Sequence, residues 1–330
     1  MDSDNEDTMT ERFDVVVVGG GAAGLAGALT LVRARRSVLV IDSGSPRNAP
    51  AAHLHGYLGH DGQSPAALLA RGREEVAGYG GRIRTGTVVA ADRLPDGGFL
   101  VRCGDGSTVR AGRLLVATGL VDELPAVPGL RERWGRDVLH CPYCHGWEVR
   151  DEAVAVLADG PLAVFQAGLW RQWTARTTLL AHTWRLTAED RELLAARGVE
   201  VVEGEVTGLL VEEDRLTGVT LAGAGEARCS ALVVAPRFTA RSGILTGLGL
   251  PTTALERDGH VVGTCVEADP LTGATAHPGV WAAGNVASPM EQVAGAAAQG
   301  VRAAAAINSD LVEAETRRAV AAHRAATGTR

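Results

Sequence analysis

The feature that most constrains the fold is a glycine-rich turn directly after a short apolar run. The run Phe13–Val18 is typical of a buried parallel strand, and Gly19-x-Gly21-x-x-Gly24 follows it. A helical pattern over Leu25–Arg35 comes next, and Ser37–Asp42 reads as a second strand that ends in an acid. The first glycine permits a tight turn, the second lets the backbone approach a pyrophosphate, and the third packs helix on strand. This order predicts a βαβ unit that binds a dinucleotide.

Asp42 supports this interpretation by its position. It lies about 20 residues after the glycines, where an acid can bind a ribose hydroxyl. An ordinary strand–turn–helix without a ligand is the alternative. The agreement of strand, spacing and acid favours the dinucleotide site.

A Cys-x-x-Cys pair is the second informative feature. Cys141 and Cys144 enclose Pro142 and a tyrosine, and His145 follows directly. A thiolate performs disulfide exchange, so one of these sulfurs needs an environment that lowers its pKa. Pro142 in the first turn of a helix would place the sulfurs near the helix N-terminus and its partial positive charge. His140 and His145 flank the pair and can shuttle protons near neutral pH, so the segment predicts a redox dithiol.

Two structural interpretations compete with a redox dithiol. One is a pair of reduced structural thiols, which a neighbouring dinucleotide fingerprint disfavours. The other is a zinc site made of His140, Cys141, Cys144 and His145. Zinc sites usually draw their ligands from two separated pairs, and the sequence has no second Cys-x-x-Cys, so no metal is expected. The isolated cysteines lie in apolar or strand-like contexts and are expected to be structural: Cys103, Cys229 and Cys265.

Composition limits the partners and the location. The chain has 330 residues, enough for two domains with substantial cores, and a net charge of −7 without a dense basic run. We therefore expect no nucleic-acid partner. Residues 1–7 are acidic and lack the basic and apolar regions of a signal peptide. No apolar stretch approaches the ~18 residues of a membrane span, so a cytoplasmic protein without a membrane contact is predicted.

The rest of the chain alternates between strand and helix signals. Ser64-Pro65 is an N-cap followed by proline, which predicts a helix from Ala66 to about Tyr79. From about residue 250 the chain returns to the first unit and ends in an Ala-rich helix, Gln292–Asn308, whose small residues suit close packing. The other predicted strands are Ile83–Val89, Gly98–Cys103, Thr108–Val116, Ala153–Leu157, Thr177–Ala181, Val199–Val202 and Leu232–Ala235, with a helix that ends near Trp173.

These parts together resemble a low-molecular-weight thioredoxin reductase over residues 12–312. The resemblance rests on the first glycine fingerprint, on Ala117-Thr118-Gly119, on the dithiol, and on Gly279–Asn285 followed by Gln292-Val293. It implies an α/β fold with two Rossmann-like dinucleotide-binding domains, FAD as the cofactor, and a homodimer.

The resemblance also implies the domain organisation. The FAD-binding domain would be split in sequence into residues 12–125 and 246–330. Residues 126–245 would form an inserted, degenerate pyridine-nucleotide-type domain that carries the Cys-x-x-Cys pair. Residues 1–11 are predicted to be a disordered tail.

Roles for individual residues follow from the same resemblance. Cys144 would face the flavin, Cys141 would exchange with the substrate, and His145 would take the proton that each exchange releases. The residues expected to bind FAD are Gly19, Gly21, Ala22, Ala23, Gly24, Asp42, Arg47, Asn48, Ala117, Thr118, Gly119, Gly284, Asn285, Gln292 and Val293.

Three histidines are candidates for a substrate pocket. His53 and His55 lie in a Gly- and Pro-containing loop after the second strand, and His140 precedes the dithiol. In the family this loop passes near the flavin, so either loop histidine can line the pocket or assist as a base. A histidine that braces the loop is the preferred interpretation of both.

Several positions depart from the reductase pattern. The second glycine fingerprint reads Ala158-Asp159-Gly160-Pro161, so its first glycine is lost and a proline removes a backbone donor. The basic cluster that binds the NADP phosphate is replaced by His182-Thr183-Trp184-Arg185, in which Trp184 can fill the vacated space. Asn285 replaces the usual aspartate near the ribityl chain, and His145 replaces the usual acid. NADPH is therefore not expected as a cofactor.

Within the family, the motif and the eroded nicotinamide site are similar to the dithiol oxidases of disulfide natural products, of the gliotoxin and holomycin type. This implies oxidation of a small-molecule dithiol to an intramolecular disulfide, with electrons passing through the cysteine pair and FAD to O2. A thioredoxin-type disulfide reductase driven by NADPH or ferredoxin is the alternative, with Gly160 and Arg185 supporting weak nucleotide binding. A non-catalytic flavoprotein that senses redox state through the cysteine pair is a third possibility.

Overall fold

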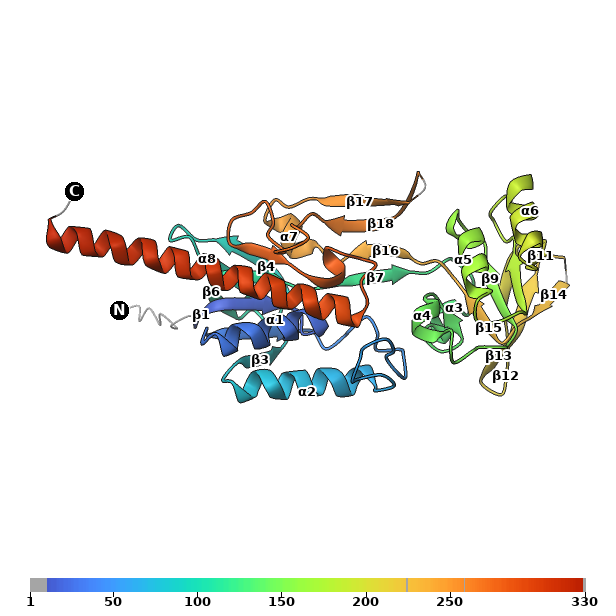
Figure 1. The fold of residues 1–330 in the computed structure, drawn as a ribbon, viewed down its shortest axis with the longest axis horizontal. Coiled ribbons are helices and arrows are strands. Elements are labelled where there is room, and N and C mark those ends of the chain that lie inside the picture. The colour runs from blue at the N-terminus through green and yellow to red at the C-terminus, as the bar shows by residue number, and fades with distance from the viewer. Residues whose placement is uncertain (1–10, 224, 258, 329–330) are drawn as a thin grey trace, which may run out of the picture.

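The computed structural model describes residues 11–223, 225–257 and 259–328. The predicted disordered tail, residues 1–11, lies outside these residues except for Glu11. A larger and a smaller α/β unit follow one another along the long axis of the molecule (Figure 1). Two antiparallel strands, β7 (Leu120–Glu123) and β16 (Arg237–Ala240), lead into and out of the smaller unit. The predicted α/β fold is confirmed.

The larger unit is built on a seven-stranded sheet to which both ends of the chain contribute. The strand order is β3-β2-β1-β6-β5-β4, and β19 pairs in parallel with β6. The central strand β1 is buried, because its alternating side chains belong to two apolar clusters, one shared with the helices α1, α2 and α8 and the other with β4 and β5. Its elements are β1 (Arg12–Val18), α1 (Ala22–Arg33), β2 (Val38–Asp42), α2 (Pro65–Gly78), β3 (Arg82–Thr85), β4 (Val88–Arg93), β5 (Phe99–Cys103), β6 (Thr108–Val116), β19 (Val280–Ala282), the short 3-10 helix η1 (Gly284–Val286) and α8 (Val293–Thr327).

Helices α1 and α8 approach each other backbone to backbone. A Cβ atom on Gly300 of α8 would lie 2.0 Å from the Ala23 carbonyl oxygen of α1. The close packing expected of the small residues in the C-terminal helix is therefore confirmed. The prediction that this helix ends at Asn308 is wrong, because α8 continues to Thr327 and closes with a left-handed Gly328 (φ 66°). Arg36 hydrogen-bonds Asn308 and pairs with Glu315, which anchors the added turns.

A four-stranded sheet, β17-β18-β16-β7, lies beside the first one. It comprises β7, β16, β17 (Thr252–Arg257) and β18 (His260–Val266), and α7 (Gly243–Gly247) follows β16. The β17–β18 hairpin points from the larger unit toward the smaller one (Figure 1). The chain re-enters this sheet at Arg237, earlier than the predicted junction near residue 245.

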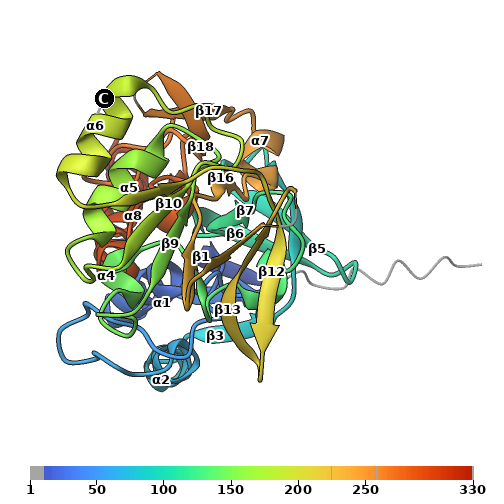
Figure 2. The same cartoon turned by 90° about the vertical axis from the view of Figure 1, so that its right-hand side faces the viewer.

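The smaller unit contains a five-stranded parallel sheet, β11-β10-β9-β15-β8, and a three-stranded antiparallel sheet, β12-β13-β14 (Figure 2). Its core centres on the fully buried Trp170 and the four buried residues of β9. The elements are α3 (Leu130–Arg133), β8 (Val138–Leu139), α4 (Pro142–His145), β9 (Val154–Leu157), α5 (Leu162–Trp170), β10 (Thr177–Leu180), α6 (Ala188–Ala196), β11 (Glu200–Val202), β12 (Val206–Glu212), β13 (Arg215–Leu221), β14 (Gly225–Arg228) and β15 (Ala231–Val233).

Two predicted elements have different bounds. The single strand expected over Ile83–Val89 is two strands, because the chain turns at Gly86, whose N–H donates to the Asp42 carbonyl. The helix expected to end near Trp173 ends at Trp170, and the Trp173 ring packs against the Trp170 ring at 6.2 Å. Both differences arise at turns.

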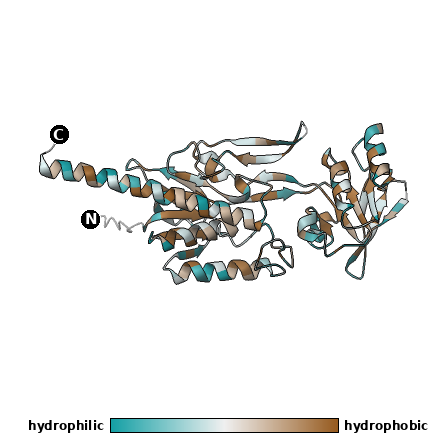
Figure 3. Cartoon of the chain, in the orientation of Figure 1, coloured by the Kyte–Doolittle hydropathy of each residue, from teal (hydrophilic) through white to brown (hydrophobic). Residues whose placement is uncertain are grey.

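Hydropathy follows this architecture. Apolar residues concentrate in the central strands of both units, and hydrophilic residues are frequent on α2, on α6 and along the far part of α8 (Figure 3). Within the described ranges, no helix combines the length and apolar composition that crossing a membrane requires.

Candidate redox site

A cavity of about 890 Å³ lies between the two units. Residues from the glycine turn, the loop after β2, the end of β6 and the start of α8 line it on one side. The dithiol segment and α5 line it on the other. Every predicted FAD-binding residue except Gly24 borders this cavity, as do the dithiol, His145 and the three pocket histidines. The fold thus gathers these residues, and their individual roles stay predictions.

The glycine turn is built for close backbone approach. Gly19 has φ 103°, and a Cβ atom there would lie 2.4 Å from the Ala117 carbonyl oxygen. Gly24 does not border the cavity, and a Cβ atom there would lie 1.8 Å from the Gly19 carbonyl oxygen, so the helix packs closely on the turn. Gly21 has open space at this position, with no atom of the described residues within 4 Å, and it precedes the first turn of α1. This turn fits a pyrophosphate bound at the helix start.

Asp42 lies beside the turn at the end of β2. Its Oδ1 accepts a hydrogen bond from the Gly20 N–H at 3.0 Å, and its Oδ2 pairs with Arg73 at 3.1 Å. The two contacts orient the carboxylate at the cavity wall, where a ribose hydroxyl can reach it.

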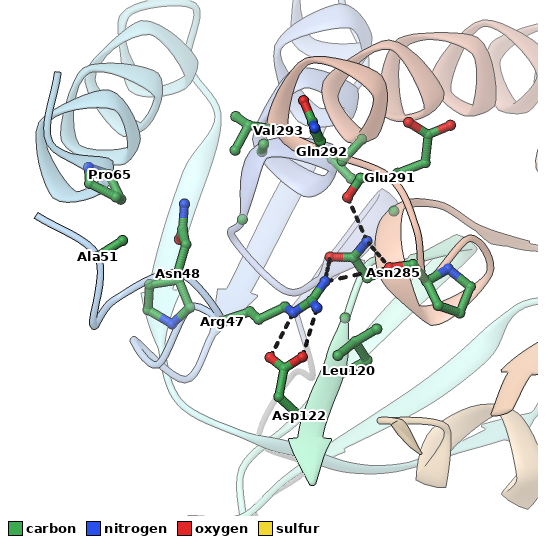
Figure 4. A pocket seen from close by; sticks show the side chains of 18 of the residues that line it. Arg47, Asn48, Ala51, Pro65, Leu120, Asp122, Asn285, Glu291, Gln292 and Val293 are labelled. Carbon is green, nitrogen blue, oxygen red and sulfur yellow. Dashed lines mark hydrogen bonds and ion pairs between the residues drawn. The ribbon is translucent and has the colours of Figure 1, made fainter. Parts of the chain in front are cut away.

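Arg47 lies between an acid and an amide on the cavity floor (Figure 4). Its guanidinium forms a two-pronged pair with Asp122 at 2.7 and 2.8 Å, and Nη1 donates to Asn285 Oδ1 at 3.2 Å. The planar fork of arginine suits this bidentate geometry. The pair ties the loop after β2 to β7, which leads into the smaller unit.

The structure explains the amide at position 285. The Asn285 Nδ2 group donates to the carbonyl oxygens of Ser288, Pro289 and Glu291 at 2.9 to 3.2 Å. A carboxylate has no N–H to donate, so an aspartate would face three acceptors. Asn285 therefore organises the loop that leads into α8.

The two dithiol sulfurs are in contact. Cys141 is the N-cap residue of α4, and Cys144 lies in that helix, so that the Cys144 Sγ donates to the Cys141 Sγ at 2.8 Å. The Gln292 side-chain amide, from the start of α8, approaches the Cys141 sulfur at 3.8 Å. The dithiol of the smaller unit thus touches the larger unit.

The two thiols differ strongly in acidity. The hydrogen bond from Cys144 lowers the pKa of Cys141 to about 7, and the backbone N–H groups of Cys144 and Tyr143 and the Gln292 amide add to this effect against the opposing effect of burial. The same contact, together with burial, raises the pKa of Cys144. At neutral pH the pair therefore consists of a partly ionised Cys141 and a protonated Cys144.

His145 follows the pair and is mostly buried. Burial lowers its pKa, so the imidazole is neutral at neutral pH. Neither ring nitrogen has a hydrogen-bond partner among the described residues. A neutral imidazole next to the dithiol can accept a proton, so His145 has the properties of a general base.

The other histidines have distinct surroundings. His140 Nδ1 lies 3.1 Å from the Val234 carbonyl oxygen, and burial lowers the pKa of His140. His55 faces two carboxylates: Nδ1 lies 3.4 Å from Asp61 and Nε2 lies 3.3 Å from Glu148. His53 borders the same cavity, with its ring 6.3 Å from the ring of His55.

The second fingerprint lies among contacts from its own unit and from the β17–β18 hairpin. The Ala158 carbonyl accepts hydrogen bonds from the N–H groups of Thr183 and Trp184 at 3.2 and 3.0 Å. The Trp184 ring meets the His260 ring edge-on at 5.6 Å. In the same hairpin, the Arg257 guanidinium lies 4.8 Å from the centre of the Phe165 ring on α5.

The sequence alone did not identify several residues of the site. Glu148 stands inside the dithiol motif, but its partner His55 is far away in sequence. Asp122 shows no local signal for its pairing with Arg47, and Phe165 reads as an ordinary apolar helix residue. No group of three or more His, Cys, Asp or Glu side chains in the described part of the chain is arranged to hold a metal ion.

Comparison with known proteins agrees with this geometry. Residues 13–300 match the family model described as pyridine nucleotide-disulphide oxidoreductase. Thioredoxin reductase sirT from Leptosphaeria maculans is 31% identical over 325 residues, which cover 93% of this chain and 97% of that protein. A probable thioredoxin reductase from Arthroderma benhamiae is 33% identical over 176 residues, 52% of this chain and 43% of that protein. The matched part of the chain thus spans less than half the length of the latter relative.

Among solved structures, the crystal structure of HlmI superimposes with a TM-score of 0.89 and 47% sequence identity, over 96% of this chain and 97% of that chain. The resemblance predicted from the motifs is confirmed at the level of the family, which implies FAD as the cofactor. Because the family model covers most of its length, the chain belongs to the pyridine nucleotide-disulphide oxidoreductases and is a flavin-dependent, thioredoxin reductase-like redox enzyme.

Proposed function

We propose that the protein is an FAD-dependent dithiol oxidase that forms an intramolecular disulfide in a small molecule and passes the electrons to O2. The proposal rests on one observation: Cys141 and Cys144 border the same cavity as the glycine turn, and their thiols differ strongly in pKa. A thiolate beside a protonated thiol suits exchange with a substrate dithiol. The cavity between the units gives a small molecule access to the pair.

In this proposal FAD binds to the larger unit, the counterpart of the FAD-binding domain predicted for residues 12–125 and 246–330. The glycine turn would bind its pyrophosphate, and Asp42 would bind a ribose hydroxyl. Arg47 and Asn285 would line the cavity beside the rest of the cofactor. Bound FAD supplies an acceptor for one electron pair, which O2 then takes up to give hydrogen peroxide.

The exchange steps follow from the two thiols. A substrate thiolate attacks the Cys141 sulfur of the oxidised pair, and Cys144 leaves as a thiolate that takes up a proton. The second substrate thiolate then attacks the substrate sulfur of the mixed disulfide, and Cys141 leaves. Its lowered pKa makes Cys141 the better leaving group in this step. The substrate loses two electrons and two protons, and the cysteine pair gains the electrons.

His145 is the proposed base for the substrate thiols. It must be neutral to accept a proton, and burial keeps its pKa below the ordinary value. A single buried imidazole can serve both exchanges only if it returns each proton to solvent.

Residues 126–245 form, in this proposal, a unit that no longer binds a nicotinamide dinucleotide. Ala158 carries a methyl group and an occupied carbonyl where the tight turn should be, and Pro161 lacks an N–H. Around this segment, the Trp184 ring contacts His260 and the guanidinium of the hairpin residue Arg257 lies over the Phe165 ring. We therefore propose that NADPH does not serve this enzyme.

Anaerobic bleaching of the flavin tests the proposal. Dithiothreitol, as a small dithiol, should reduce the bound flavin, NADPH at millimolar concentration should not, and air should reoxidise it with release of hydrogen peroxide. Rapid bleaching by NADPH followed by turnover of a disulfide would instead establish a reductase. Failure of both donors would favour a non-catalytic redox sensor.

One observation favours the reductase as a second candidate. A Cβ atom on Gly160 would meet no atom of the described residues within 4 Å, so the backbone is open there. A dinucleotide phosphate can approach at this point, and Arg185, in the segment that replaces the basic cluster, is exposed. Titration with NADPH can be followed by the quenching of tryptophan fluorescence. A measurable dissociation constant would support this candidate.

We also propose a homodimer, from the family resemblance. Sedimentation velocity at several protein concentrations distinguishes a dimer from a monomer.

A further inference from the structure

The cavity wall carries a pair of side chains that the proposed exchange steps do not use. Phe165 lies on α5 in the smaller unit, and Arg257 is the last residue of β17 in the larger unit. The Arg257 guanidinium lies over the Phe165 ring, 4.8 Å from the ring centre, and both residues border the cavity. A cation at this distance is attracted by the π-electrons of the ring. The pair therefore joins the two units at the wall of the cavity.

Phe165 gives this part of the wall an apolar surface. The residue is 53% exposed although it is a large hydrophobic residue. Leu169 follows four residues later, so it lies on the same face of α5, and it borders the cavity half-buried. Small-molecule pockets are lined mainly by such side chains, with a few polar groups that fix the orientation of the ligand. Phe165 and Leu169 thus provide the apolar part of a binding surface.

Arg257 provides the polar part. Its guanidinium forms no hydrogen bond and no ion pair with any residue in the described ranges. Arg47, on the same cavity, differs in this respect, because Asp122 accepts two hydrogen bonds from it. Contact with a ring leaves the N–H groups of a guanidinium free to donate. Carbonyl and carboxylate oxygens are the acceptors that match this planar group, so Arg257 is available to such an oxygen on a ligand.

We propose that Phe165 and Arg257 determine substrate specificity. Phe165, together with Leu169, binds the apolar body of the dithiol, and Arg257 donates to a carbonyl or carboxylate oxygen on that body. This inference rests on the proposed function, because it takes a small dithiol as the substrate. Cys141 borders the same cavity, so the substrate thiols exchange there while the body of the molecule contacts the pair. The favoured substrate class is therefore a dithiol that carries an apolar body with an oxygen acceptor.

Three small dithiols with the same spacing between their sulfurs test this assignment. Propane-1,3-dithiol has neither an apolar chain nor a carbonyl group, dihydrolipoamide adds a chain that ends in an amide, and dihydrolipoate has the same chain with a carboxylate. The second-order rate constant of anaerobic flavin reduction is measured for each. Both lipoyl dithiols should react roughly tenfold faster than propane-1,3-dithiol. A preference for either lipoyl dithiol supports the proposal and names the acceptor.

Variants of the pair should change this specificity ratio. Arg257→Gln should lower the rate constants of both lipoyl dithiols by roughly tenfold relative to that of propane-1,3-dithiol. Phe165→Ala should lower the same ratio, because the chain loses its apolar contact. Both residues are exposed, so folded variants are expected.

Arg33 and Tyr79 provide a matched control pair. The Arg33 guanidinium lies 5.4 Å from the centre of the Tyr79 ring, and Tyr79 is 57% exposed. Neither residue borders the cavity. Arg33→Gln and Tyr79→Ala should therefore leave the specificity ratio at its wild-type value.

Three results would overturn the proposal. An equal loss for all three dithiols in Arg257→Gln would show that the pair only holds the units together. Loss of FAD from this variant, seen in the visible spectrum, would place the arginine at the cofactor. Binding of NADPH that disappears in Arg257→Gln would assign the guanidinium to a nucleotide phosphate.

Binding of a disulfide gives a readout that needs no oxidase activity. Lipoamide and lipoate are the oxidised forms of two of the probes and carry no thiol that could reduce the flavin. Isothermal titration calorimetry measures their dissociation constants with the oxidised, FAD-bound enzyme. These constants should rise roughly tenfold in Arg257→Gln and stay constant in Arg33→Gln. If no dithiol bleaches the flavin while this pattern is seen, the oxidase proposal fails and the binding surface stands. If dithiols bleach the flavin and the constants are equal in all variants, the binding surface fails.

Discussion

Cys144 donates a hydrogen bond to Cys141 at 2.8 Å, and this contact is the largest cause of the difference in acidity between the two thiols. The donor stabilises the Cys141 thiolate, and the resulting negative charge makes ionisation of Cys144 unfavourable. One sulfur is therefore prepared to exchange with substrate while its neighbour holds a proton.

Alkylation of the reduced enzyme should show this difference. Iodoacetamide should label Cys141 at a rate that rises with pH, reaches half its maximum at about 7, the pKa of its thiol, and levels off well above that pH. Cys144 should stay unlabelled over the same range. Peptide mass spectrometry at each pH measures both sites. Cys144→Ala removes the donor, so the Cys141 profile should move to higher pH, and an unchanged profile would contradict the account.

Both sulfurs are needed for exchange. Cys141→Ser and Cys144→Ser should each abolish oxidation of a small dithiol, because a serine oxygen cannot form the disulfide. FAD content should stay normal, since the glycine turn lies in the other unit. Oxygen uptake and the visible flavin spectrum measure the two quantities. Cys265→Ser is the control, as Cys265 lies in β18 and does not border the cavity. Near wild-type turnover in either active-site variant would refute the proposed relay of electrons.

Removal of the proposed base should slow the reaction without stopping it. His145→Ala should reduce the rate of flavin reduction by dithiothreitol by about 10²–10⁴-fold near neutral pH. The loss should shrink at high pH, where hydroxide ionises the substrate thiols directly. Stopped-flow absorbance of the flavin across pH measures the effect. A constant rate at every pH would remove His145 from the mechanism.

Two glycines test the packing of the fold. Gly300→Ala should lower the free energy of unfolding by about 1–3 kcal/mol, because its Cβ would lie 2.0 Å from the Ala23 carbonyl oxygen. Gly168→Ala, in α5, meets no atom of the described residues within 4 Å and should raise stability by up to about 1 kcal/mol. Urea unfolding of the FAD-bound protein measures both. Similar effects of the two changes would show that the helix contact is not tight.

The amino-acid sequence alone determined the local elements that carry the chemistry. The βαβ unit, the turn at Gly19 and the position of Asp42 follow from short-range patterns, since backbone dihedrals and hydrophobic periodicity act over a few residues. The same holds for the cysteine pair, whose x-x spacing brings both sulfurs to one turn of α4.

Only the tertiary structure decided which of these elements meet. The pairing of Arg47 with Asp122, of His55 with Glu148 and of Arg257 with Phe165 joins residues that are far apart in the chain. The contacts of His55 and Arg257 depend on how the two units are placed by β7 and β16, and short-range patterns carry no information about that placement. The amide of Asn285 shows the same division, because its identity is visible in the sequence but its three carbonyl partners exist only once the loop before α8 has folded.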